Sequence, residues 1–223
     1  MIDNVLKYPD TCIYGKVIPK ITFYKFLEVS PAMKRHFQDD VVSITWLYKI
    51  SPDTLQVRSS DTMKEIEIFL AELKDAECDL RLFQFIDKNI SKHIVFILRR
   101  EQQYKLLINY KEWADTAHTH FDITQTFQSD WVTLAQLTLP IQGNELPNIY
   151  DNFVRFIAGE KLKGESASNL SEDVLSFQHQ QELEKRVAQL EQALNKETQP
   201  HRKFELHQQL ISAKKELDII WKN

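Results

Sequence analysis

The stretch that decides the fold is LEKRVAQLEQALNKETQPHRKFELHQQLISAKKEL, residues 183–217. Its apolar residues recur at alternating spacings of four and three, the spacing of the buried seam between paired helices. The segment 197–201, ETQPH, interrupts this pattern, because proline cannot continue the hydrogen-bond ladder of a helix. We therefore expect an antiparallel helical hairpin over residues 171–221, an arrangement that buries both seams. The expected seam residues are Leu175, Leu183, Val187, Leu190 and Leu194 before the loop, and Leu206, Leu210, Ala213, Leu217 and Ile220 after it.

The hairpin also carries more apolar residues than two helices can bury against each other. Large apolar residues left exposed on a helix face mark a contact with another surface. We therefore expect the hairpin to pack on its own body, on a second copy of the chain or on another protein. The surplus residues are Leu175, Phe177, Ile211, Ile219 and Trp221.

Upstream of the hairpin, residues 159–171 read GEKLKGESASNLS, a glycine- and serine-containing segment of mixed charge. Such a composition is typical of a linker. The sequence therefore predicts a globular body over residues 1–158, a linker over 159–171 and a helical arm over 172–223.

The first half of the body alternates between helical and extended patterns. Residues 23–37 have helical spacing with a break near Pro31. Residues 42–50 place apolar side chains at every second position, which predicts a strand. A turn at Ser51, Pro52 and Asp53 would then lead into a short second strand over residues 54–58, so that the two strands form a hairpin.

Residues 62–75, TMKEIEIFLAELKD, fit either a helix after Asp61 or a strand, and we favour the strand, because it would pair with the preceding hairpin. The remainder of the body predicts a helix, two strands, an irregular stretch with aromatic anchors and a closing helix. The fold class is thus α+β, a mixed sheet with flanking helices followed by an antiparallel, coiled-coil-like hairpin. The ranges are 79–90 (helix), 93–98 and 103–110 (strands), 112–148 (irregular) and 149–157 (helix).

Composition excludes several classes of protein. Hydrophobic residues make up 43% and charged residues 27%, the balance of a globular protein rather than a disordered one. The net charge of −4 excludes a globally basic nucleic-acid coat. The two cysteines provide no disulfide framework, and none of the four glycines forms a phosphate-binding loop motif. With no long apolar run and no secretory signal at the start, we expect a cytoplasmic protein that does not enter a membrane.

Several phrases of the sequence, in this order, resemble a bacterial family known only as domain-of-unknown-function family 4391. The resemblance is densest at the hairpin loop, where charged residues form a KE–Q–RK–EL signature. The resemblance implies that the gene lies beside helicase and DNA-methyltransferase genes in restriction-like, anti-phage loci. The phrases are ITWLYKISPDTLQV (44–57), EIEIFLAELK (65–74), FIDKNISKHIVFIL (85–98), the SDW–LP stretch (129–140) and LNKETQPHRKFELHQQL (194–210).

The resemblance implies a non-catalytic accessory protein of a bacterial defence or restriction-like assembly, with no cofactor. Its arm would dock a helicase, a methyltransferase or nucleic acid. A basic cluster at the hairpin loop, formed by Lys196, His201, Arg202 and Lys203, suits contact with phosphates or with an acidic protein surface. A solvated turn would explain the same charges. A homodimer whose arms pair with each other is a further hypothesis.

The alternative function is a metal-dependent nuclease of the restriction-endonuclease-like fold. Nucleases of that fold place an acid at the start of their second strand and an acid-x-lysine on the third. Asp53 opens the expected second strand, and Glu72 and Lys74 lie on the expected third. Asp53 and Glu72 would then hold Mg²⁺ while Lys74 activates water. Acid-x-lysine is also common on ordinary amphipathic surfaces, so whether the protein is an enzyme stays open at this point.

Overall fold

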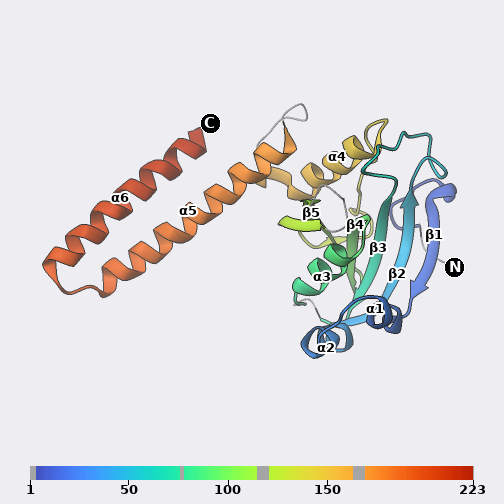
Figure 1. Ribbon diagram of the computed structural model, residues 1–223, viewed down its shortest axis with the longest axis horizontal. Helices are drawn as coiled ribbons and strands as arrows, with labels where there is room; N and C mark the ends of the chain where they lie inside the picture. The colour runs from blue at the N-terminus through green and yellow to red at the C-terminus, as the bar shows by residue number, and fades with distance from the viewer. Residues whose placement is uncertain (1–3, 76–77, 115–120, 163–168, 223) are drawn as a thin grey trace. The chain divides into compact units, whose positions relative to one another are not determined.

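The computed structural model describes residues 4–75, 78–114, 121–162 and 169–222, and Figure 1 shows its course. The chain divides into two compact units, Met1–Gly159 and Glu160–Asn223. The first is built on a mixed β-sheet with helices, and the second contains two long helices that pack together as a hairpin. The predicted α+β class is confirmed. None of the helices within the described ranges is long and apolar enough to span a membrane.

The sheet of the first unit follows the order of the chain. Its strands are arranged β1-β2-β3-β4-β5-β6, and the short β7 pairs with β5. β3 and β4 are parallel, because a helix crosses over between them, whereas the other pairs in the described residues are antiparallel. The strands are β1 (Ile13–Ile18), β2 (Val41–Ile50), β3 (Ile66–Leu73), β4 (His93–Arg100), β5 (Gln103–Trp113), β6 (Phe121–Gln128) and β7 (Val132–Thr133).

Helices cover both faces of this sheet (Figure 1). Three of them, α1 (Lys20–Phe26), α2 (Pro31–Asp39) and α3 (Arg81–Asn89), contribute Phe23, Phe37 and Phe83 to one hydrophobic core with the inner residues of β2–β5. The helix α4 (Leu146–Ala158) lies on the opposite face. The predicted break at Pro31 is the start of α2, which Ser30 caps by accepting a hydrogen bond from the Met33 amide. Two short 3₁₀ helices complete the described elements, η1 (Asp10–Cys12) and η2 (Gly159–Lys161).

The predicted strand over residues 54–58 is wrong. Residues 51–65 form a connection that is rich in turns, in which Thr54 Oγ1 donates to the Lys49 carbonyl and accepts from the Ser51 amide. These contacts close a turn directly after β2, so the chain leaves the sheet. The strand that pairs with β2 is β3, with Ile50 opposite Ile66 and Val41 opposite Leu73. The strand assignment that we favoured for residues 62–75 is therefore confirmed.

The prediction of an irregular stretch over residues 112–148 is wrong in part. This stretch contains β6, which pairs along much of β5. Phe121 and Phe127 near its two ends are buried, whereas the residues between them are exposed or half-exposed and, apart from Ile123, polar. Burial at only the two ends of an edge strand leaves a weak alternation of apolar and polar residues, and a sequence-based prediction depends on that alternation. Pairing with β5 therefore determines this strand.

The second unit contains α5 (Leu170–Lys196) and α6 (Pro200–Lys222), joined by residues 197–199. The predicted hairpin is confirmed. Leu183, Leu210 and Ala213 are buried along its seam. The prediction is wrong for one seam residue. Leu175 is 56% exposed, and its neighbour Val174 is buried instead.

Candidate interaction surface on the helical hairpin

The structure does not bring Asp53 together with Glu72 and Lys74. Asp53 follows β2 in the turn beside the Ile50–Ile66 pair, whereas Glu72 pairs with Ser43 near the other end of the same two strands. At about 3.3 Å per residue, the two ends of this ladder lie roughly 20 Å apart, too far for one cation to join the carboxylates. The nuclease hypothesis required a second strand over residues 54–58. Because that strand is absent, the hypothesis loses the geometry that would bring Asp53 close to Glu72.

Glu72 and Lys74 are each occupied by structural contacts. The Glu72 carboxylate accepts a hydrogen bond from Arg99 at 2.7 Å and another from Ser43 at 3.3 Å. The Lys74 ammonium donates to the Gln38 carbonyl at 2.7 Å. Among the described residues, no group of three or more His, Cys, Asp and Glu side chains is placed to hold a metal ion.

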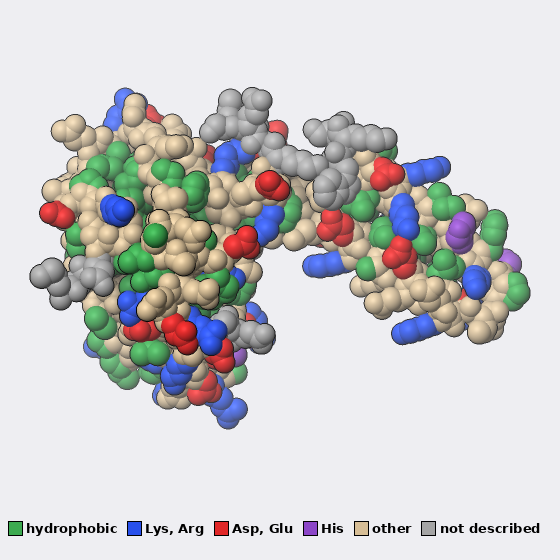
Figure 2. All heavy atoms as spheres, turned by 180° about the vertical axis from the view of Figure 1, so that it is seen from behind, with side chains coloured by type: hydrophobic (Ala, Val, Ile, Leu, Met, Phe, Trp, Pro, Cys, Tyr) green, Lys and Arg blue, Asp and Glu red, His purple; other side chains and the backbone are tan. Residues whose placement is uncertain are grey.

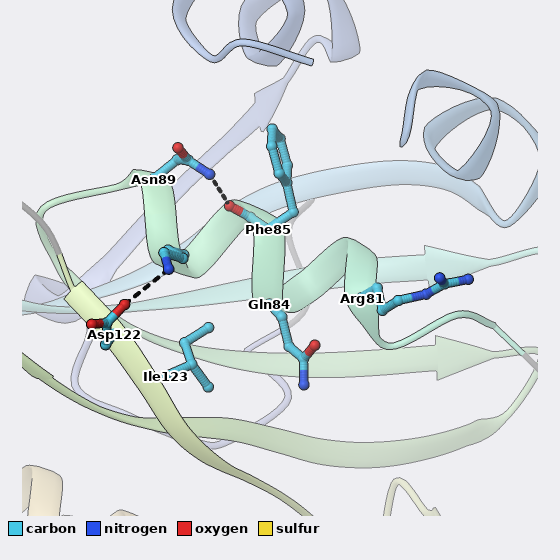
Figure 3. A pocket seen from close by; sticks show the side chains of 7 residues that line it. Arg81, Gln84, Phe85, Asn89, Asp122 and Ile123 are labelled. Atoms are coloured by element: carbon cyan, nitrogen blue, oxygen red, sulfur yellow. Dashed lines mark hydrogen bonds and ion pairs between the residues drawn. The ribbon is translucent and has the colours of Figure 1, made fainter. Parts of the chain in front are cut away.

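A surface hollow lies between the outer side of α3 and β6 (Figure 3). The Lys88 ammonium crosses it to Asp122 at 2.9 Å, and Asn89 donates to the Phe85 carbonyl at 2.8 Å. Gln84 reaches Thr126 of β6 at 2.8 Å. The polar groups of the hollow thus bind one another and fasten α3 to the sheet, so we assign them a structural role.

The most deeply buried charges also hold α3 in place. Lys111 of β5 lies 2.5 Å from the Asp87 carboxylate, and both side chains are fully buried. The Lys111 ammonium donates as well to the backbone carbonyls of Asp87, in the last turn of α3, and of Lys92, which follows the helix. A cation at a helix C-terminus is favourable, because the unpaired carbonyls there carry partial negative charge.

Glu67 lies close to these charges on β3 and is almost completely buried. Burial, together with the nearby charge of Glu65, raises the pKa of the Glu67 carboxyl to about 7. Glu65 itself is held by Lys49 and Lys92, each at 2.7 Å, and these two lysines help to lower its pKa.

The loop of the hairpin is organised by one acidic side chain. The carboxylate of Glu197 accepts hydrogen bonds from the amides of Thr198 and Gln199 at 2.9 and 2.8 Å. These bonds from the backbone lower the pKa of Glu197. Pro200 then begins α6, where its fixed backbone angle is already helical and its missing amide costs nothing. The acidic residue and the proline of the loop signature therefore have a structural explanation.

The basic residues of the same loop have no such explanation in the turn itself. Lys196, Arg202 and Lys203 are exposed. His201 is also exposed and lies 3.4 Å from Glu205. Figure 2 shows histidine and hydrophobic side chains near this end of the hairpin, which we call the tip (residues 196–204). The four basic residues predicted as a binding cluster thus lie within one short segment, on the surface.

An aromatic side chain that the sequence analysis did not single out lies among these charges. Phe204 is 64% exposed. Further along α6, Ile211 is 37% exposed and Ile219 is 61% exposed. Exposure of Leu175, Ile211 and Ile219 agrees with the predicted surplus of apolar residues, whereas the side chain of Trp221 lies outside the described residues. The sequence analysis considered the a/d positions, and Phe204 lies outside them. A large apolar residue outside the seam of a helical hairpin is the signal that could have predicted its exposure.

The comparisons with known proteins identify a family without a known activity. The family model described as Domain of unknown function (DUF4391) matches residues 6–217. No curated protein matches the chain. No solved structure matches it either.

Proposed function

The chain belongs to the DUF4391 family, and we propose that it is a non-catalytic interaction protein whose helical hairpin docks a protein partner. The observation that carries this proposal is the tip, where Phe204 is 64% exposed beside Arg202 and Lys203. An exposed aromatic residue flanked by arginine is the composition of binding hot spots, because the ring supplies apolar area and the guanidinium supplies directed hydrogen bonds.

The charge balance of the hairpin favours a protein over a nucleic acid as the partner. Residues 170–222 contain eight Lys or Arg residues against nine Asp or Glu residues. Binding to a polyanion depends on neutralising successive phosphates, which needs a continuous basic surface. The tip offers only a local basic cluster beside Glu197 and Glu205, a pattern that suits an acidic patch on a protein surface.

The resemblance of the sequence to a family found beside helicase and DNA-methyltransferase genes supports a more specific proposal. The partner is a helicase or a DNA methyltransferase of a bacterial restriction-like or anti-phage assembly. In that assembly the body serves as a scaffold and the tip makes the contact.

Affinity capture from a lysate of the source bacterium tests the proposal. The full-length chain is the bait, and the matched variants are Arg202→Ala with Lys203→Ala at the tip and Lys185→Ala with Arg186→Ala in the middle of α5. Both double variants remove two exposed positive charges from the same hairpin. We expect mass spectrometry to find a helicase or methyltransferase subunit enriched by the wild type and by the α5 variant, and at least tenfold less by the tip variant.

Nucleic-acid binding is measured in parallel by fluorescence anisotropy with labelled DNA and RNA over a range of salt concentrations. Submicromolar binding that is lost in the tip variant, with a flatter salt dependence, would assign the tip to phosphates instead of a protein. Equal capture by the wild type and the tip variant would contradict the proposed role of the tip.

A further inference from the structure

The first strand and the first two helices of the body carry an excess of positive charge. Residues 13–39, from β1 to the end of α2, contain five Lys or Arg residues and two acidic ones, Glu28 and Asp39. The chain as a whole has 28 Lys or Arg and 32 Asp or Glu, so the remaining residues hold 23 and 30. Segment 13–39 therefore has a net charge of +3, and the remainder has −7. An anionic partner is attracted to this part of the body.

Within this segment, three lysines each hold their ammonium group over an aromatic ring. Such a contact is favourable because the face of an aromatic ring carries partial negative charge. It also places a positive charge and a flat apolar surface side by side at each of the three positions. The distances from the ammonium nitrogen to the ring centre are 4.5 Å for Lys16 and Tyr14, 5.3 Å for Lys25 and Phe26, and 5.0 Å for Lys34 and Tyr24.

The three rings lie on the side of the sheet that α1, α2 and α3 cover (Figure 1). Tyr24 of α1 packs against the core beneath these helices, and so does Trp46 of β2. The ring centre of Tyr14 lies 4.1 Å from that of Trp46, which places Tyr14 on the same side. Phe26 is the last residue of α1, and its side chain is 71% exposed, against 38% for Tyr14. Tyr14 and Phe26 are therefore the rings that a ligand can reach.

A single-stranded nucleic acid offers the groups that this surface would contact. Its phosphates are anionic, and its bases are unpaired, so each base can stack on an aromatic ring. A lysine has a long, flexible stem and can leave the ring for a phosphate. The base that then takes its place gains more from stacking than an exposed ammonium group does. In a duplex the bases are already stacked inside the helix and cannot reach the rings.

A protein partner fits this surface less well. Lysine is depleted in protein interfaces, whereas four of the five basic residues in segment 13–39 are lysines. An acidic protein segment would satisfy the charges, but it lacks the repeated flat groups that would also use the rings beside them. The combination of lysines with reachable aromatic rings therefore favours a single-stranded nucleic acid.

We propose that the surface of Tyr14, Lys16, Lys25 and Phe26 binds single-stranded nucleic acid, with the rings stacking on bases and the lysines contacting phosphates. The proposal goes beyond the proposed function, because it concerns the body, whereas the protein partner is assigned to the tip. Few lysines take part and the chain has a net charge of −4, so we expect a dissociation constant in the micromolar range at about 0.1 M salt.

Fluorescence anisotropy of the full chain with labelled oligo(dT) and oligo(U) of about 20 nucleotides tests the proposal, beside a duplex of the same length. We expect both single strands to bind at least tenfold more tightly than the duplex. Phe26→Ala should weaken the binding of single strands about tenfold. Lys16→Ala with Lys25→Ala should reduce the slope of log affinity against log salt by about 1.4, since two phosphate contacts are lost.

Two matched controls should leave this binding unchanged. Phe156→Ala removes a ring of α4 that is 43% exposed on the opposite face of the sheet. Lys64→Ala with Lys88→Ala removes two exposed positive charges from other parts of the body. The far-UV circular dichroism of Phe26→Ala should equal that of the wild type, because most of this side chain is already in solvent.

A wild type that binds no single strand at about 200 μM protein, or a Phe26→Ala variant that binds as before, would overturn the proposal. The tip variant, Arg202→Ala with Lys203→Ala, should bind single strands like the wild type, and a loss of binding there would overturn the proposal by placing the nucleic acid at the tip. Loss of a captured protein in Phe26→Ala, without strand binding by the wild type, would assign the surface to an acidic protein instead. Strand binding by a chain whose tip captures no partner would contradict only the proposed function.

Discussion

The body and the hairpin bury their apolar residues to very different extents. In the body, large side chains such as Phe37, Phe83 and Phe153 are completely buried. In the hairpin, the described large apolar residues are divided between a narrow seam, represented by Leu210, and an outer face where Phe204 is 64% exposed. The body thus has a deep core of its own, although Val17, Ile21 and Phe26 are exposed on its surface, whereas the hairpin buries apolar residues only along a narrow seam.

Charged residues show the same contrast. Asp87 and Lys111 of the body are fully buried and paired, so they cannot meet a partner. Arg202 and Lys203 of the hairpin are exposed on a tip whose turn is already held by Glu197. Substitutions of buried residues in the body should therefore change stability, and substitutions on the outer surface of the hairpin should change association.

The largest expected effect is that of Lys111→Ala. Removing one partner of a buried ion pair leaves the Asp87 carboxylate buried without its cation, which costs about 3–5 kcal/mol. The melting temperature should fall by roughly 10 °C, measured by calorimetry. The control is Lys88→Ala, which breaks the exposed pair with Asp122 and should cost at most about 0.5 kcal/mol. Equal losses in the two variants would contradict the structural role of Lys111.

A slightly smaller effect is expected from Glu67→Gln, which should change how the free energy of unfolding depends on pH. Burial raises the pKa of Glu67 from 4.5 to about 7, so the folded state binds this proton more tightly than the unfolded state. The resulting stabilisation is present in full below pH 4.5 and is lost as the pH rises through 7, about 3 kcal/mol in total. Glutamine mimics the neutral acid, so urea denaturation of the variant should lack this decline. Identical pH profiles would show that Glu67 is not the cause.

The smallest effect in this series compares two neighbours on α6. Leu210→Ala removes a buried seam residue and should destabilise the hairpin by about 2 kcal/mol, seen as an earlier loss of helical circular dichroism on heating. Ile211→Ala, one residue further on the outer face, should change it by about 0.5 kcal/mol or less in dilute solution. A reversed order would mean that the seam and the outer face have been exchanged.

Sequence patterns were sufficient for elements whose burial is regular. The hairpin seam follows a helical period, β2 places apolar residues at every second position, and β4 begins with a short apolar run, so each was predicted from the chain alone. The absent strand over residues 54–58 shows the limit: the turn closed by Thr54 depends on hydrogen bonds to Lys49 and Ser51 that no periodicity reveals. β6 was missed for a related reason, since pairing with β5 outweighs its weak pattern.

The candidate site was predictable only in part. The basic residues of the tip form a visible run, but their exposure beside Phe204 depends on which face α6 turns towards α5. The predicted site residues Asp53, Glu72 and Lys74 do not come together, because β3 rather than residues 54–58 pairs with β2. The sequence pattern does not specify which segment pairs with β2 or in which register. The pair of Asp87 and Lys111 joins residues far apart in the chain, and such a contact leaves no local signal.

The central claim is that the hairpin serves association and is not needed to complete the core of the body. The most direct measurement is the urea denaturation of a fragment ending at Gly164, followed by near-UV circular dichroism and compared with the full chain. The account predicts one cooperative transition for the fragment, close to that of the body in the full chain, and a fragment that captures no protein partner. A fragment that precipitates or unfolds without cooperativity would contradict it, because the hairpin would then be part of the core.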